Sequence, residues 1–265
     1  MRLITAILFL ISCLVTPAFA QGEIDDEEKI FYRNEQTYAA TLNSHGLSAG
    51  FRYARRIDAF RKTIYEAEFA QIKDAEEIKI TFSSNQFGGS FVYGKLNAFG
   101  TLRAGIGIQK ELFRKHDKGG ISIRYFYTFG PSIGFIKPVY YEISRIEADP
   151  NGVQVEVTSV EQFERHVLNN IERKAPFYVG LTETKVAPGL YGKFGFTFEF
   201  SRKDMAFNAL ETGIVFDAFI RKIPIMANDY NTWYFPAFFI SYRFGKVIDS
   251  QFKSGPNRVD ELLTE

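Results

Sequence analysis

The chain has 265 residues, one cysteine and nearly balanced charge, with 32 Lys and Arg residues against 31 Asp and Glu residues. The single cysteine is Cys13, so a chain processed after residue 20 has no thiol for a disulfide, a thiolate metal site or a cysteine nucleophile. Loss of Arg2 with that segment leaves 31 basic and 31 acidic residues. This balance argues against a nucleic-acid or polyanion binder.

The first twenty residues have the pattern of an export signal. Arg2 precedes an apolar run from Leu3 to Val15, and the small residues Ala18 and Ala20 suit cleavage before residue 21. Residues 10–13 allow an alternative, a lipoprotein box ending at Cys13. The apolar stretch continues past that cysteine, which favours the signal-peptide interpretation.

No later stretch reaches the ~18 uninterrupted apolar residues of a membrane-spanning helix. The chain nevertheless contains 28 Phe and 14 Tyr, while its mean hydropathy is only −0.13. High aromatic content at modest hydropathy suits strands that are apolar on one face only. If this protein spans a membrane, we expect it to do so as a β-barrel.

After an acidic, polar segment at residues 21–36, the chain divides into eight runs of alternating apolar and polar residues. Turn or loop residues separate them. The expected strands are Thr37–Ser44, Leu47–Arg56, Thr63–Lys73, Asn97–Phe113, Ile121–Phe135, Leu181–Phe200, Ala206–Ile220 and Thr232–Phe244.

The sixth run shows the alternation most clearly, because Phe194, Phe196 and Phe198 share one face while Lys193 and Thr197 lie on the other. A soluble barrel also has one apolar face, turned inward, so the polar face must distinguish the two cases.

That polar face carries repeated Gly and Thr with isolated charges of both signs, which suits a crowded lumen better than open water. Phe126, Phe207, Phe235 and Phe239 are exceptions on the polar parity. We expect a lumen charge network made of Arg52, Glu66, Glu68, Arg103, Glu111, Arg124, Lys193, Glu199, Glu211, Asp217 and Arg243.

The connections alternate in length, as in bacterial barrels with short periplasmic turns and longer outer loops. We therefore expect an all-β, antiparallel transmembrane barrel over residues 37–246, with both termini periplasmic. Residues 21–36 would form a periplasmic N-terminal segment and residues 247–265 a polar periplasmic tail.

The third outer loop, residues 136–180, shows signs of order. Alternating residues flank the turn sequence Asp149–Gly152, which predicts an extracellular hairpin. Ser159 and Gln162 match a capping box, so we expect a short helix after the hairpin. Its apolar stripe, with Phe163, Val167 and Ile171, would pack on the rim or bind a partner.

The sequence segments Leu190–Phe196 and Ile240–Gly245 resemble segments of small outer-membrane β-barrel proteins, in particular uncharacterised barrels of Bacteroidota. The resemblance covers about Gln36 to Gly245. It lies in the architecture and in the residue pattern of the strands rather than in a catalytic motif. The polar tail departs from the commonest pattern, in which a terminal aromatic ends the last strand. The resemblance implies outer-membrane lipids as partners.

Candidate chemistry is sparse. His45, His116 and His166 fall in three different connections without metal-binding spacing, so we expect neither metal nor cofactor. An outer-membrane lipid-modifying enzyme could use His45 as general base with Ser44 or Ser48 as nucleophile, but no third orienting group is evident. The simpler interpretation of His45 is a turn residue.

The Glu66/Glu68 pair is better explained by ion pairing than by acid–base chemistry, because residues two apart on a strand share a face with many charges.

Three functions remain open. The first is a side-chain-filled barrel with a structural or interaction role in the bacterial envelope, with an envelope protein as a possible partner. The second is a narrow gated pore, and the third is the lipid-modifying enzyme.

Overall fold

A computed structural model describes residues 33–81, 90–115, 119–148, 154–163, 171–203, 205–228 and 231–249. The export signal expected at residues 1–20, the Asp149–Gly152 turn, His116, Val167 and His166 lie outside the described residues. Among the residues described, no helix is long and apolar enough to cross a membrane.

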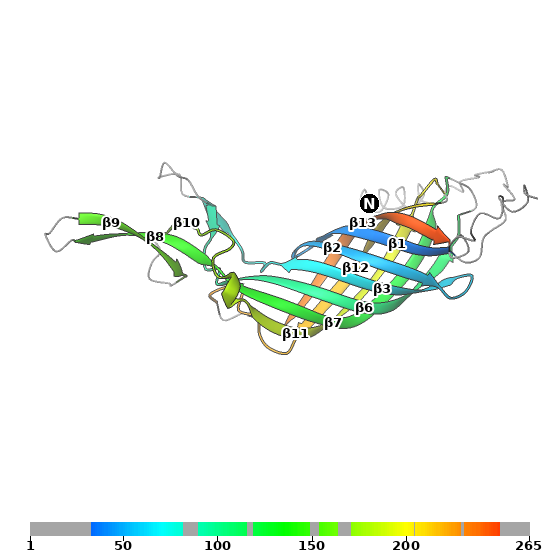
Figure 1. Ribbon diagram of the computed structural model, residues 1–265. Coiled ribbons are helices and arrows are strands. Elements are labelled where there is room, and N and C mark those ends of the chain that lie inside the picture. Colours follow the sequence, from blue (N-terminus) through cyan, green and yellow to red (C-terminus); the bar gives the residue numbers. More distant parts are fainter. Residues whose placement is uncertain are drawn as a thin grey trace, which may run out of the picture.

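Eight long antiparallel strands close into a barrel, which confirms the predicted fold class (Figure 1). Their order around the wall is β1-β13-β12-β11-β7-β6-β3-β2. The strands are β1 (Arg33–Asn43), β2 (Gly46–Arg56), β3 (Arg61–Ile72), β6 (Asn97–Phe113), β7 (Ser122–Pro138), β11 (Lys185–Glu199), β12 (Ala206–Phe219) and β13 (Tyr234–Asp249).

The wall is longer at both chain ends than the sequence predicts. Arg33 pairs with Asp249 where β1 and β13 close the barrel. The start of β1 looks like a polar segment in sequence because its inward residue Glu35 is charged, and that carboxylate is buried inside the barrel. The sixth strand is shorter than expected, since a 3₁₀ turn at Leu181–Glu183 precedes Lys185.

The side chains are sorted in the opposite sense from a soluble protein. Phe194 and Phe196 on β11 are 42% and 38% exposed, whereas Lys193 and Thr197 on the same strand are 3% and 0% exposed. The same sorting recurs around the wall, so the barrel presents apolar side chains outward and encloses charged ones. This is the arrangement of a barrel whose outer surface faces lipid.

The four aromatic exceptions on the polar parity are buried and fill the lumen. Phe126 and Phe239 belong to an apolar layer in the middle of the barrel, with Ile64 and Tyr191. Phe235 belongs to a second layer that closes the end bearing the long connections. Its other members are Ile72, Phe99, Ile136, Ala187, Phe219, Ile223, Ile225 and Met226.

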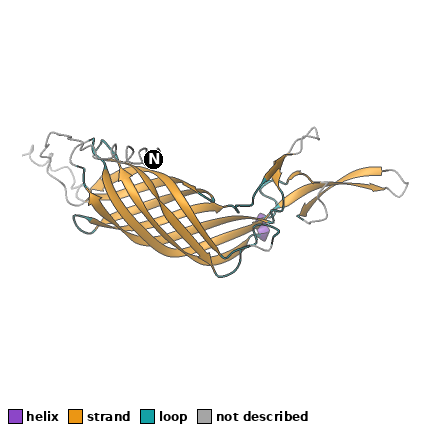
Figure 2. Ribbon diagram, turned by 180° about the vertical axis from the view of Figure 1, so that it is seen from behind, coloured by secondary structure: helices purple, strands orange, loops and turns teal. Residues whose placement is uncertain are grey.

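Short turns join the strands at one end, which we call the turn end. At the other, the arm end, three of the four connections are long, and only β1 and β2 are joined by a tight turn, at Ser44 and His45. At the arm end, β4 (Lys79–Thr81) pairs with β5 (Ser90–Val92). A three-stranded sheet of order β10-β8-β9 also lies there, and Figure 2 shows it from the opposite side. Its strands are β8 (Tyr140–Ala148), β9 (Gln154–Gln162) and β10 (Ile171–Lys174).

The expected hairpin is present, but the expected helix does not begin where the capping signal placed it. Ser159 and Gln162 lie within β9, and Ile171 begins β10. Strand β9 pairs with β8 over its whole length, from Tyr140–Gln162 to Ala148–Gln154. The β-branched residues of this segment fit a pleated strand, and a neighbouring strand outweighs a local capping signal.

Candidate functional site: the charged lumen and the outer module

The middle of the lumen contains a closed network of four cations and four carboxylates. Each cation contacts two carboxylates. The cations are Arg52, Arg103, Lys193 and Arg243, and the carboxylates are Glu66, Glu68, Glu211 and Asp217. All eight side chains are at most 3% exposed. The four positive and four negative charges leave this central network neutral.

Strand register and lumen width both shape the network. Arg52 lies opposite Glu66 in the β2–β3 register, and its Nη2 is 2.8 Å from Glu66 Oε2. The same guanidinium reaches across the lumen, with Nη1 2.7 Å from Glu211 Oε1 on β12. Arg103 likewise joins Glu68 at 2.7 Å and Asp217 at 2.6 Å. These contacts tie opposite sides of the wall together.

A second network, the turn-end network, lies nearer the short turns. Glu35 accepts from Arg124 at 2.9 Å and also pairs with Lys62. Glu199 pairs with Arg124 and accepts from Lys115 at 3.0 Å. Close by, Glu111 lies 3.3 Å from Arg114 and accepts from Ser122 at 3.2 Å.

Aromatic rings cover several of these cations. The Arg52 guanidinium lies 4.2 Å from the Phe126 ring centre, and Lys193 Nζ lies 4.6 Å from that of Phe239. Such contacts are favourable for cations removed from water. The aromatic exceptions to the sequence pattern therefore pack against the charges that it predicted.

All eleven residues expected in the lumen lie on inward positions of the wall, and all contribute to one of the two networks or to the adjoining Glu111 group. The sequence reasoning missed Glu35, Lys62, Arg114 and Lys115. Glu35 and Lys62 lie on the inward parity of their strands, so extending the alternation a few residues outward would have found them.

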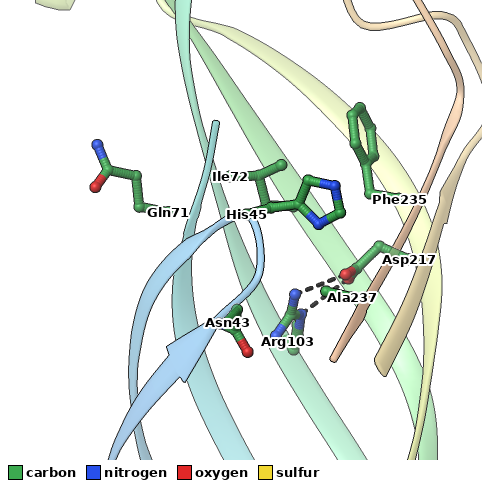
Figure 3. A pocket seen from close by; sticks show the side chains of 8 residues that line it. All are labelled: Asn43, His45, Gln71, Ile72, Arg103, Asp217, Phe235 and Ala237. Atoms are coloured by element: carbon green, nitrogen blue, oxygen red, sulfur yellow. Dashed lines mark hydrogen bonds and ion pairs between the residues drawn. The ribbon is translucent and has the colours of Figure 1, made fainter. Parts of the chain in front are cut away.

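At the arm end, a recess opens above the Arg103–Asp217 pair (Figure 3). Asn43 and His45 contribute to its lining. Ser44 Oγ lies 3.1 Å from His45 Nδ1, but no described carboxylate hydrogen-bonds this imidazole. A nucleophile and base are thus adjacent without the orienting group that the enzyme interpretation requires. Ser48 instead accepts a hydrogen bond from Asn43.

Within the described part of the chain, no group of three or more His, Cys, Asp or Glu side chains could hold a metal ion. The carboxylates that do come close together are neutralised by Arg and Lys.

The outer module comprises the β10-β8-β9 sheet and the β4–β5 hairpin. An apolar cluster of its own holds these two parts together. Phe91, Val139, Tyr141, Ile143 and Phe163 are its buried members. Phe163, expected on a helix stripe, thus packs in this cluster. Burial raises the pKa of the Tyr141 phenol, and its hydroxyl donates to the carbonyls of Val92 and Lys95.

The chain matches no protein-family model, and no curated protein matches it in sequence. It does resemble solved structures of small barrels. The attachment invasion locus protein Ail of Yersinia pestis is 8% identical, covering 82% of this chain and 98% of that one, with a TM-score of 0.38. Neisserial surface protein A is 10% identical, covering 81% and 96%, with a TM-score of 0.35.

The N-terminal β-barrel domain of Pseudomonas aeruginosa OprF is 7% identical and covers 82% of this chain and 99% of that one, with a TM-score of 0.34. At these identities and scores, the likenesses carry no argument about function.

Proposed function

We propose that this chain is an outer-membrane β-barrel that anchors its outer module in the bacterial envelope for an interaction role. The observation that carries this proposal is the sorting of side chains in the wall, with apolar residues outward and buried ion pairs inward. Lipid is the surrounding that makes such an outer surface stable. An export signal at residues 1–20 is consistent with this destination.

The orientation is part of the proposal. The turn end would face the periplasm, together with residues 21–32 and 250–265, and the outer module would face outside. The alternation of short turns and long connections supports this orientation, because bacterial barrels have short periplasmic turns. In this setting the lipids of the outer membrane are the barrel's direct partners.

The filled lumen favours a structural or interaction role over a gated pore. An eight-stranded barrel has an interior just wide enough for side chains. Here two ion-pair networks and two apolar layers occupy it. Opening a path would require separating buried charges from their partners, which is costly in a low-dielectric interior.

The β8–β9 hairpin, which we call the arm, is the part best placed to bind a partner. It continues from β7 after the single residue Val139 and projects away from the barrel (Figure 1). In the order β10-β8-β9, β9 is an edge strand with no neighbour on one side among the described residues. An exposed edge can pair with an extended segment of another protein.

A deletion confined to the arm tests this proposal. Ile143 lies opposite Ser159, so removing residues 144–158 and joining the two through Asn-Gly should give a two-residue hairpin. The outer apolar cluster, including Tyr141 and Phe163, remains intact. We expect the variant to fractionate with outer membranes and to migrate faster on gels before boiling than after, as the wild type should.

The same variant should lose the partners that the wild type retains from solubilised envelopes after crosslinking. A matched control deletes residues 250–265, which leaves β13 whole. Retention of every partner by the arm deletion, with loss in the tail deletion, would assign the interaction to the periplasmic side instead. Recovery of the wild type in the soluble periplasmic fraction would refute the membrane location itself.

A further inference from the structure

The turn-end network differs from the central network because its charges do not balance. Among the residues that the structure describes, and with Arg56 and the Glu111–Arg114 pair counted in, five cations meet three carboxylates there: Arg56, Lys62, Arg114, Lys115 and Arg124 against Glu35, Glu111 and Glu199. Glu35 and Glu199 are each shared by two cations, and Glu111 pairs with Arg114. Arg56 has no described carboxylate within ion-pair distance.

Arg56 is held by backbone carbonyls instead, and Arg114 shares one of these carbonyls in addition to its pair with Glu111. Arg56 donates from Nε to Asp58 O at 3.0 Å and from Nη2 to Ala59 O at 2.5 Å. Arg114 donates from Nη2 to the same Ala59 carbonyl, and its guanidinium lies 4.3 Å from the Phe60 ring centre. Two guanidinium groups therefore converge on one neutral oxygen, and Nη1 of each makes no hydrogen bond to a described residue.

A recess opens beside these groups. Its lining comprises Arg56, Ala59, Phe60, Lys62, Gln109, Glu111 and Arg124. Asp58 fixes the turn below it by accepting hydrogen bonds from the backbone N–H groups of Phe60 and Arg61, which lower the pKa of the Asp58 carboxyl. Arg56 is thus positioned by a well-bonded turn, and its side chain lines the recess.

We propose that a phosphate group binds at the mouth of this recess at the turn end of the lumen, between Arg56, which lines the recess, and Arg114, which shares the Ala59 carbonyl with it. Two spare guanidinium donors match the several acceptor oxygens of phosphate, and planar guanidinium forks bind such anions well. The bound anion would offset the surplus of two positive charges that the three carboxylates leave. The phosphate can belong to a lipid headgroup or to a soluble phosphate compound, and both present the same oxygens.

In a membrane location such as the proposed one, the site would lie near the depth of lipid headgroups. Ile57 and Phe60, on the β2–β3 turn beside the recess, are 55% and 53% exposed. Apolar side chains next to cations are typical of a membrane interface, where basic pockets bind headgroup phosphates. The inference concerns the isolated barrel and does not depend on which side of the membrane the turn end faces.

The test uses the folded full-length barrel without its export signal, in an uncharged detergent, titrated with inorganic phosphate by calorimetry. In parallel, its unfolding midpoint is measured in phosphatidylcholine vesicles with and without a fraction of phosphatidylglycerol. R56Q and R114Q each remove one proposed contact. R61Q is the matched control, because Arg61 is on the same turn, its side chain is 59% exposed, and it pairs with Asp58 rather than with the Ala59 carbonyl that Arg56 and Arg114 share.

We expect R56Q and R114Q to weaken binding about tenfold, the size of a charge-assisted hydrogen bond, and R61Q to change it less than twofold. Saturable phosphate binding with this pattern assigns a soluble phosphate. Stabilisation by phosphatidylglycerol alone, lost in R56Q and R114Q, assigns the phosphate of an anionic headgroup, because the choline cation neutralises the phosphate of the reference lipid.

Absence of both responses, or equal sensitivity to R61Q, overturns the proposal. Heat-dependent gel mobility of each variant shows that it is folded, so a loss of binding cannot be attributed to misfolding.

Discussion

At the scale of single residues, Glu66 has the largest number of charged contacts in the lumen. Its carboxylate lies 2.8 Å from Arg52, 3.1 Å from Lys193 and 3.4 Å from Arg243. Because burial removes the solvation of all four groups, each depends on the others for compensation. Removing one carboxylate therefore leaves several buried cations partly unpaired.

We predict that E66Q lowers the free energy of unfolding by about 3–5 kcal/mol, the usual result of breaking a buried charge pair. Urea unfolding in detergent, followed by the fluorescence of the single tryptophan, measures the effect. The control R61Q breaks an exposed pair with Asp58 and should change the free energy by about 0–1 kcal/mol. Equal effects from the two substitutions would contradict the assignment of the lumen as a low-dielectric site.

Glycine also acts at this scale, where neighbouring strands approach closely. Gly195 and Gly213 face each other in the β11–β12 register, and a Cβ on Gly213 would lie 2.1 Å from Phe194 O. A Cβ added at Gly192, on the same pair of strands, would have its nearest neighbour, Phe129, at 4.0 Å. Of Gly213 and Gly192, only Gly213 therefore requires the absence of a side chain.

We therefore predict that G213A destabilises the barrel by about 1–3 kcal/mol, the cost of overpacking. G192A should have little effect, because a methyl group there reaches only ordinary contact distance. The same urea titration compares the two variants, and a larger effect at Gly192 would show that close strand approach does not govern this part of the wall.

At the scale of elements, the eight strands follow from the sequence because period-2 alternation persists wherever the wall separates two environments. The lumen residues follow for the same reason, since each charge was placed by its parity. The contacts across the lumen, such as Arg52 with Glu211, could not be predicted, because they depend on barrel closure between residues 159 apart. The turn-end surplus was missed since Arg114 and Lys115 follow the end of the predicted strand Asn97–Phe113 and so were not assigned to the lumen.

The helix expected after Ser159 shows where a local sequence signal fails to predict the structure. A capping box and an apolar stripe are local signals, and they specify a helix only if no better partner is near. Here β8 supplies that partner and pairs with the whole of β9. Pairing with β8 also places Phe163 in the outer cluster with Tyr141, which the helical stripe did not anticipate.

The apolar outer face gives a prediction about whole strands. Ile214 lies in the middle of β12 and is 51% exposed. We predict that I214R costs about 2–4 kcal/mol, the cost of Arg near the bilayer midplane. I57R, at the β2–β3 turn, should cost about 0–1 kcal/mol because it lies near the interface.

The measurement is folding into lipid vesicles. The mild comparison is placed at the turn and not on the inward face, because an inward residue such as Thr197 is completely buried in a packed lumen. A larger cost for I57R than for I214R would mean that the apolar face is not a lipid face.

At the scale of the whole molecule, the layers of the lumen decide whether the barrel conducts. From the turn end to the arm end, a path would cross the turn-end network, the central network with its apolar layer, and the apolar layer around Phe99 and Phe235. The central network is neutral and each of its cations has two carboxylate partners. A permeating ion would therefore meet no unpaired cation there. Phe219 and Phe235 pack edge to face in the last layer.

We predict that the purified barrel, inserted into planar bilayers, gives no steady ohmic channels. Filled eight-stranded barrels differ in this from porins of 16–18 strands, whose wider interiors hold an aqueous channel. A porin reconstituted in the same bilayers is the positive control, and heat-dependent gel mobility shows that the inserted protein is folded. Large, steady conductance from the folded barrel would refute the filled lumen, and it would favour the pore among the functions that the sequence leaves open. Brief, rare openings would instead report transient separation of the ion pairs, and E66Q should make them more frequent because it weakens the network that closes the lumen.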